Sequence, residues 1–143
     1  MTVKSLNHIG VVVRSIDDRK PFYEDILGLQ FEGLEEVPLQ KVRVAFFRAG
    51  DVRIELLEPT HPDSAVAKFL EKRGEGLHHL SFAVDDIQTR IDELKQRGLE
   101  VIDAQPRLGA HQMQTAFVHP KSCFGVLVEL CEPARVRGSD ETT

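Results

Sequence analysis

The chain has little that would place it in an oxidising compartment or a membrane. Its 143 residues include only two cysteines, Cys123 and Cys131, too few for the disulfide framework of a small secreted protein. No apolar run approaches the roughly 18 residues that a membrane helix needs. The opening segment MTVKSLNH lacks the apolar core of a secretory signal peptide. We therefore expect a soluble cytoplasmic protein.

Basic residues are also few relative to acidic ones. Lysine and arginine total 18 against 23 aspartates and glutamates, a net charge of -5 with neutral histidines. A nucleic-acid-binding protein of this size usually has a surplus of positive charge, so this class of partner is disfavoured. Apolar residues make up 41%, enough for one packed core. We expect a single domain over 1–133, followed by a mobile polar tail at 134–143.

The chain contains an internal repeat. The segment LNHIGVVV at 6–13 matches LHHLSFAV at 77–84, 71 residues later. A second pair, VRIELLEP at 52–59 and VLVELCEP at 126–133, is 74 residues apart, so the halves differ by a three-residue insertion. We interpret the chain as a tandem duplication. Its parts are module one at about 5–58, a linker at 59–76 and module two at about 77–132.

Each module has the pattern of a strand, a helix and three further strands, which predicts an α+β fold of tandem βαβββ modules. The helices are expected at 15–27 and 86–97, where apolar residues recur at helical spacing and a glycine follows. We expect their buried sides to carry Ile16, Phe22, Ile26, Ile87, Ile91 and Leu94. The strands are expected at 5–13, 29–37, 41–49, 51–58, 77–84, 99–105, 112–119 and 124–131. The linker is expected to hold a short helix capped by Ser64 or Asp63.

Polar side chains interrupt apolar strands at matching positions of the two modules. Because alternate strand residues share a face, His8 lies with the small residue Gly10, and its counterpart His79 also lies with small residues. Glu55 and Glu129 are each flanked by large apolar neighbours. An unpaired buried carboxylate is costly, so each glutamate requires a partner.

The repeat indicates what that partner is. Equivalent positions of two related modules can converge, which brings His8, Glu55, His79 and Glu129 to one point. Two imidazoles and two carboxylates suit a divalent metal ion with positions left open for water or substrate. Each residue alone is more simply explained as a core histidine or an edge-strand glutamate, but the coincidence in both repeats favours a metal site. Cobalt, manganese, nickel, iron and zinc all accept such ligands.

The duplicated pattern resembles the vicinal oxygen chelate superfamily, which includes glyoxalase I, and within it the methylmalonyl-CoA epimerases. The matching segments are LNHIGVVV, VRIELLEP, SAVAKFLEKRGEGLHHLSFAVDDI, RLGAHQ and HPKSCFGVLVELCEP, and they span most of 5–133. The resemblance implies a curved mixed sheet around a divalent metal, cobalt before the others. It implies His8, His79 and Glu129 as metal ligands, Glu55 at a fourth position, and a homodimer. The implied activity is the interconversion of (R)- and (S)-methylmalonyl-CoA.

The chain departs from that family at several positions. Leu39 and Lys41 stand where a glutamate and a glycine are common. Phe124 stands where a glycine is usual, which implies a bulkier loop beside the pocket. Some family members carry a catalytic glutamate on the third strand, whereas this chain has Arg43 or a neighbour there, so that role is not carried over.

Inversion at carbon 2 of such a substrate needs one group that removes a proton and another that returns it on the opposite face. We expect Glu129 to be the first group and its repeat counterpart Glu55 the second. A divalent metal stabilises the charge that develops on the substrate oxygens. Lys121 and Arg107, on loops near the expected pocket, are the candidates for binding the phosphates of an acyl-CoA.

Two other functions fit the same fold. A lactoylglutathione lyase of the glyoxalase I type would use the same four ligands on a glutathione hemithioacetal, but we locate no glutathione-specific contacts in the sequence. A non-enzymatic module that binds or sequesters small molecules often lacks the metal ligands. The presence of all four candidates counts against that module.

Overall fold

The computed structural model describes residues 1–133, and the tail expected at 134–143 lies outside the described residues. The strands are β1 Ser5–Val12, β2 Gln30–Val37, β3 Val42–Ala49, β4 Val52–Pro59, β5 Gly76–Ala83, β6 Arg107–Leu108, β7 Met113–Val118 and β8 Val128–Pro133. The helices are α1 Ile16–Pro21, continued by a π-helical turn at Phe22–Ile26, α2 Ala65–Arg73 and α3 Ile87–Gln96. Short 3-10 turns occupy Ala110–Gln112 and Pro120–Cys123. No helix within 1–133 is both long and apolar enough to cross a bilayer.

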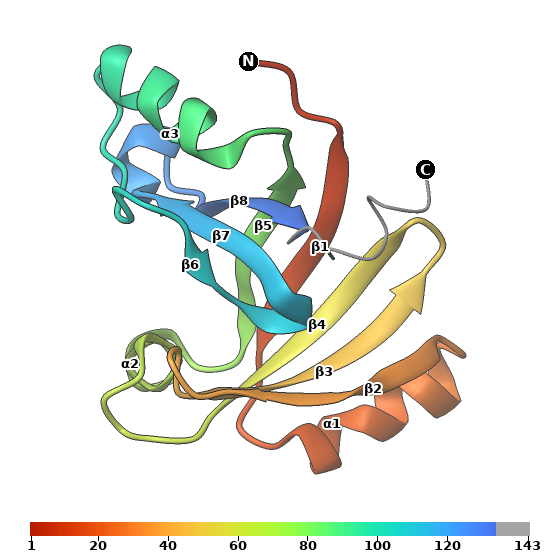
Figure 1. Ribbon diagram of the computed structural model, residues 1–143. Coiled ribbons are helices and arrows are strands. Elements are labelled where there is room, and N and C mark those ends of the chain that lie inside the picture. Colours follow the sequence, from red (N-terminus) through yellow and green to blue (C-terminus); the bar gives the residue numbers. More distant parts are fainter. Residues whose placement is uncertain (134–143) are drawn as a thin grey trace.

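The eight strands within residues 1–133 form one mixed sheet, in the order β2-β3-β4-β1-β5-β8-β7-β6, which curls into a half-barrel (Figure 1). The two halves have the same pairing: β1 runs parallel to β4, as β5 does to β8, and β1 and β5 join the halves antiparallel. At this junction His8 lies opposite Ser81, and Gly10 lies opposite His79. The predicted α+β fold of two βαβββ units is confirmed.

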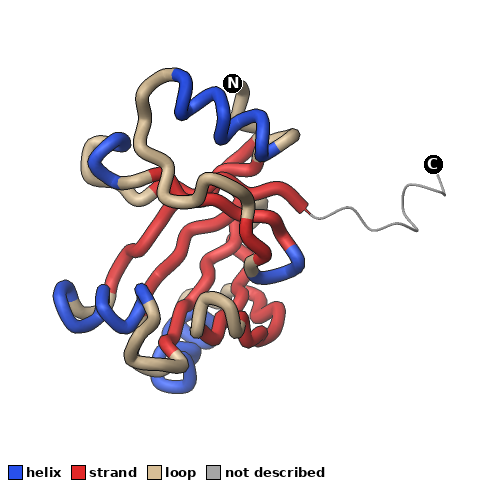
Figure 2. The backbone as a smooth tube through the Cα atoms, turned by 60° about the vertical axis from the view of Figure 1, so that its left-hand side comes forward, coloured by secondary structure: helices blue, strands red, loops and turns tan. Residues whose placement is uncertain are grey.

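Each half of the sheet is covered by its own helix, and Figure 2 shows the helical segments around the periphery of the strands. Ile16 of α1 packs with Phe47 and Leu56, and Ile87 and Ile91 of α3 pack in a separate core against β7 and β8. A third cluster lies under α2. The predicted cap of α2 is confirmed, because the Ala67 N–H donates to Ser64 Oγ at 3.0 Å.

The first helix differs from its prediction at its carboxyl-terminal end. Phe22 and Ile26, expected on the buried side, are 47% and 73% exposed, so that expectation is wrong. Pro21 has no N–H, and the chain continues as a π-helical turn in which Leu27 N–H donates to the Phe22 carbonyl at 3.0 Å. The wider turn changes which residue faces inward. Tyr23 packs against Phe47, with the centroids of the two rings 5.6 Å apart.

The expectation of a strand at 99–105 is also wrong. Within that segment only Val101 forms a bridge, to Val118, and the short strand β6 begins later. Backbone bonds join this segment to the chain at 117–119 at Ile102 N–H to the Phe117 carbonyl (2.9 Å) and at His119 N–H to the Glu100 carbonyl (2.8 Å). A side chain then takes the place of the next ladder bond, because the Asp103 carboxylate accepts from the Phe117 N–H at 2.9 Å. Lys95 Nζ donates to the Ala104 carbonyl at 3.3 Å. The segment is therefore a fixed loop, and it forms part of the wall of the cavity described below.

Candidate metal centre

The side chains of His8, His79 and Glu129 are buried and meet on the inner face of the sheet. The two imidazole Nε2 atoms lie 3.1 Å apart. Glu129 Oε1 lies 3.2 Å from His8 Nε2 and 3.8 Å from His79 Nε2. Donor atoms held at about 2.1 Å from one ion in tetrahedral geometry are about 3.4 Å from one another. The three atoms are thus spaced for one shared ion.

The protonation states of this cluster also fit a cation. Glu129 Oε1 is buried and accepts no hydrogen bond from any residue within 1–133. Burial alone would raise the Glu129 pKa, but the neighbouring histidines His8 and His79 hold it below its ordinary value. Burial lowers the pKa of His79 to about 3. An ionised carboxylate and a neutral imidazole are the forms that bind metals, so Glu129 and His79 fit a divalent ion as they stand, whereas His8, whose pKa is raised, would release a proton on binding one.

Glu55 approaches the same histidine from its other side. Its Oε2 lies 3.2 Å from His8 Nδ1, the nitrogen that faces away from the shared point. Burial raises the pKa of Glu55 to about 7, and the Glu129 carboxylate adds to the shift. Burial lowers the His8 pKa, but the two carboxylates outweigh it, so the net His8 pKa is raised. The structure therefore brings all four predicted residues together, with Glu55 one imidazole ring away from the point that the other three share.

The small residues of the two histidine-bearing faces make room for the rings. A Cβ atom added to Gly10 would lie 2.3 Å from His79 Cε1, well inside any ordinary contact. Ser81, opposite His8, is fully buried. Small side chains at these two positions let each imidazole lie across the neighbouring strand, where the two Nε2 atoms can meet.

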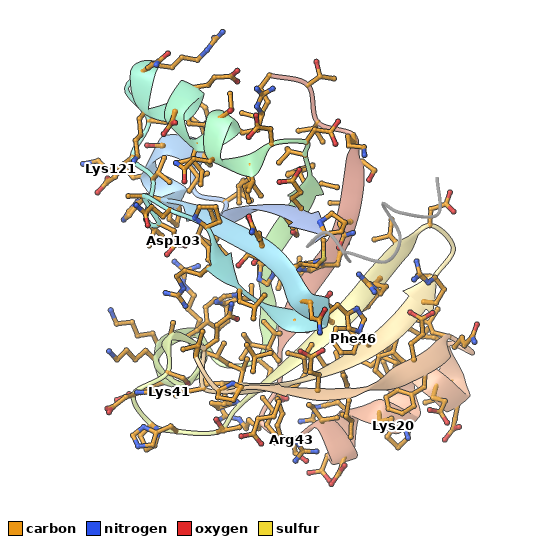
Figure 3. All side chains as sticks on the ribbon, viewed as in Figure 1. Lys20, Lys41, Arg43, Phe46, Asp103 and Lys121 are labelled. Atoms are coloured by element: carbon orange, nitrogen blue, oxygen red, sulfur yellow. The ribbon has the colours of Figure 1, made fainter. Side chains whose placement is uncertain are left out.

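A cavity of 380 Å³ opens above the cluster, and its floor includes all four candidate residues. Its wall combines the β2–β3 turn, the start of α2 and the loop after α3. Two cations line it: Lys41 on the turn and Arg107, whose guanidinium lies 3.6 Å from the Asp103 carboxylate. Lys121 does not line this cavity and projects at the edge of the molecule in Figure 3, where Lys41 and Asp103 are also labelled.

The departures from the epimerase pattern can now be located. Leu39 and Lys41 both line the cavity, and Lys41 has a positive φ of 56°, a conformation that glycine adopts more readily. Phe124 has a φ of 57° but is 99% exposed, so the bulkier loop expected there does not narrow the cavity. Arg43 is absent from the cavity lining and pairs with Glu58 at 3.3 Å.

Two residues that sequence reasoning did not assign to the site contact its histidines. Asn7 Oδ1 lies 2.8 Å from His8 Nδ1. His78, which the alternation of side chains along a strand would turn away from His79, has its Nδ1 2.8 Å from His79 Nδ1. The sequence held a signal for both, because each immediately precedes a candidate ligand at the same place in the repeat.

A half-barrel of two βαβββ halves around a buried His/His/Glu cluster is the architecture of glyoxalase-like proteins. The family model of the glyoxalase/bleomycin resistance protein/dioxygenase superfamily matches residues 7–117, and the chain belongs to this superfamily.

Particular relatives narrow the comparison. The chain is 49% identical over 128 residues to the uncharacterized protein YqjC of Bacillus subtilis, covering 90% of this chain and 91% of that one. It is 37% identical over 126 residues to the human mitochondrial methylmalonyl-CoA epimerase, covering 87% and 72%. A solved variant of the Streptomyces coelicolor methylmalonyl-CoA epimerase in complex with 2-nitronate-propionyl-CoA superposes with a TM-score of 0.90 at 35% identity, covering 94% and 98%. The chain is thus related to methylmalonyl-CoA epimerases.

Proposed function

We propose that the protein is a metal-dependent epimerase that interconverts (R)- and (S)-methylmalonyl-CoA. The observation that carries the proposal is the buried cluster of His8, His79 and Glu129 at the floor of a cavity, in a chain related to such epimerases over most of its length. The acyl-CoA analogue bound by the Streptomyces coelicolor relative supports the substrate class.

His8, His79 and Glu129 are proposed to hold the metal, with cobalt as the first candidate by resemblance. When bound, the ion supplies Lewis-acid stabilisation of the negative charge on the thioester and carboxylate oxygens once carbon 2 loses its proton. Glu55 contacts His8 Nδ1 at 3.2 Å and would join the metal only after leaving that contact. Its primary role is therefore proposed to be proton transfer.

The two carboxyl groups divide the proton chemistry between them. Glu129 has a lowered pKa and is an ionised acceptor, whereas Glu55, with a pKa of about 7, is partly protonated near neutral pH. The C–H bond at carbon 2 breaks as its proton passes to Glu129. A proton from Glu55 then forms the new C–H bond on the opposite face, and the reverse reaction exchanges these roles.

The cavity cations are proposed to bind the negative groups of the acyl-CoA. Arg107 and Lys41 line the cavity, which supports a role for both in binding the carboxylate or the phosphates. Lys121, named with Arg107 from the sequence, lies outside the cavity lining and would contact only an extended part of the coenzyme. Arg107→Ala should raise KM for the acyl-CoA more than Lys121→Ala, and the opposite ranking would assign the phosphates to Lys121.

The test is exchange of the carbon-2 proton of methylmalonyl-CoA in deuterated water, with and without chelator, on each pure enantiomer. We expect metal-dependent exchange with both enantiomers. Glu129→Gln should abolish exchange with one enantiomer and Glu55→Gln with the other, while Glu36→Gln, an exposed carboxylate of β2, should leave both unchanged.

The same assay distinguishes the proposed epimerase from the other candidate functions. Wild-type exchange with both enantiomers in Glu129→Gln would refute the proposed role of that residue. No exchange by metal-loaded protein, together with turnover of a glutathione hemithioacetal, would establish a glyoxalase instead. If no metal bound and none were needed, the protein would be a binding module. The homodimer implied by resemblance is tested by sedimentation equilibrium.

A further inference from the structure

We propose that Asn7 and His78 are positioning residues that fix the tautomer and orientation of the two histidine ligands, each through the Nδ1 atom of the histidine that follows it. The inference rests on the metal site of the proposed function but not on the identity of the substrate. Each candidate ligand and the residue before it form equivalent dipeptides of the two modules, Asn7-His8 and His78-His79. The proposed role belongs to the first residue of each dipeptide.

The geometry is the same in both halves of the sheet. Asn7 Oδ1 lies 2.8 Å from His8 Nδ1, and His78 Nδ1 lies 2.8 Å from His79 Nδ1. Asn7 and His78 are 71 residues apart, the offset of the first repeat, so they occupy equivalent strand positions. The amide oxygen of asparagine and the Nδ1 of histidine are both two bonds from Cβ. Each therefore presents an acceptor at the same distance from the backbone.

The direction of each hydrogen bond follows from the role of Nε2, the second nitrogen of each candidate ligand ring. The Nε2 atoms of His8 and His79 face each other and Glu129, which leaves Nε2 as the metal-binding nitrogen. A neutral imidazole that binds a metal through Nε2 carries its proton on Nδ1 and donates it to an outer partner. His79 Nδ1–H must then donate to His78 Nδ1, because only one of two facing nitrogens can carry the proton. The proton of neutral His78 is consequently on Nε2.

Packing holds His78 in place to accept this bond. Its ring meets that of Phe69, on α2, edge to face, with the centroids 5.1 Å apart. The His79 ring meets Phe117 on its other side at 5.3 Å. Both imidazoles are thus bounded by aromatic rings, which restricts their rotation and keeps the two Nδ1 atoms aligned.

The two histidines differ in how much their orientation depends on the residue that precedes each of them. His8 Nδ1 has a second acceptor, Glu55 Oε2, at 3.2 Å. For His79 Nδ1 the structure gives no partner other than His78 among residues 1–133. Removal of the His78 side chain should therefore weaken metal binding more than removal of the Asn7 side chain.

The first experiment measures tautomers in the metal-free protein. Long-range proton–nitrogen correlation NMR of histidine labelled with ¹⁵N identifies which ring nitrogen carries a proton. We expect the proton of His79 on Nδ1 and that of His78 on Nε2. A His78 ring protonated at Nδ1, or a His79 ring with an unprotonated Nδ1, would overturn the proposal.

The second experiment measures binding of Co²⁺ by titration calorimetry. His78→Ala should weaken binding by about 10–100-fold, the usual cost of losing an outer-shell partner. His78→Asn should restore most of that loss, because it gives the second repeat the acceptor that the first already uses. Asn7→Ala should have a smaller effect, and His61→Ala, an exposed linker histidine, should have none.

The outcomes separate this inference from the proposed function. Equal binding by wild type, His78→Ala and His78→Asn would overturn it, as would equally weak binding by the two variants with unchanged thermal unfolding. If His78→Ala did not fold, the NMR measurement of the wild-type tautomers and the Co²⁺ affinity of His78→Asn would still show whether His78 orients His79. If the wild-type protein bound no metal, the proposed function would fail, and the NMR measurement would still show whether His78 accepts from His79.

Discussion

Adding a single methyl group to β1 should displace His79, a candidate metal ligand on β5. Gly10 lies opposite His79, and a Cβ at Gly10 would be 2.3 Å from Cε1, 2.5 Å from Nδ1 and 2.9 Å from Nε2 of that ring. Carbon atoms make favourable contacts at about 3.5–4.0 Å, so the ring must move by roughly 1 Å or more in Gly10→Ala. The φ of Gly10 is not positive, so alanine meets no left-handed backbone strain there and the clash falls on the ring.

The size of the effect follows from that overlap. Overpacking of a well-filled site costs about 1–3 kcal/mol, which we expect as a loss in the free energy of unfolding of the metal-free protein. His79 Nε2 would leave its position 3.1 Å from His8 Nε2. In the bound state the ring is held toward the ion and cannot relax, so we expect the bound state to lose about 1.4–2.8 kcal/mol more than the metal-free protein, which lowers metal affinity by about 10–100-fold.

The measurements are titration calorimetry with Co²⁺ and denaturant unfolding of the metal-free protein. The matched control is the same substitution in a His79→Ala background, where the ring is absent and Gly10→Ala should cost little stability. Wild-type metal affinity and stability in Gly10→Ala would refute the reasoning, and so would an equal loss of stability in both backgrounds.

Three further outcomes are expected. Exhaustive chelation should abolish proton exchange yet leave the circular dichroism spectrum intact, because the three apolar cores contain none of the candidate ligands; loss of the fold would contradict this. Burial raises the Glu55 pKa from 4.5 to about 7, so the folded metal-free protein holds a proton that the unfolded chain releases, and stability falls as pH rises between these values. Glu55→Gln should flatten that slope in denaturant unfolding, and an unchanged slope would exclude Glu55 as its source. Burial raises the Cys131 pKa to about 12, so a thiol reagent should modify Cys123 alone in the native protein and both cysteines in denaturant; equal native reactivity would contradict this.

The duplication made most of the fold predictable from the sequence. The match between LNHIGVVV and LHHLSFAV gave two equivalent strands, and the strict alternation of side chains in a strand placed His8 and His79 on the faces that carry small residues. The prediction that Glu55 and Glu129 join them followed from equivalence of position. It needed no knowledge of how the halves pair.

Features that depend on local hydrogen bonding were not predictable in the same way. The apolar spacing at Phe22 and Ile26 fits an ordinary helix, and only a π-helical turn after Pro21 turns these residues outward. The segment 99–105 has strand composition, but Asp103 and Lys95 satisfy backbone groups that a ladder would otherwise satisfy. The contact between His78 and His79 requires two adjacent side chains of a strand to meet, which simple alternation does not predict.

The antiparallel junction of β1 with β5 makes the candidate site depend on both halves of the chain. Each half supplies one histidine and one glutamate, so a half-length chain would complete the cluster only by associating with a second copy. Joining the halves in one polypeptide replaces that association with an intramolecular step at high effective concentration. It also frees the two copies to differ, and they have: Glu129 lies at the shared point with a lowered pKa, whereas Glu55 stands outside it with a raised one.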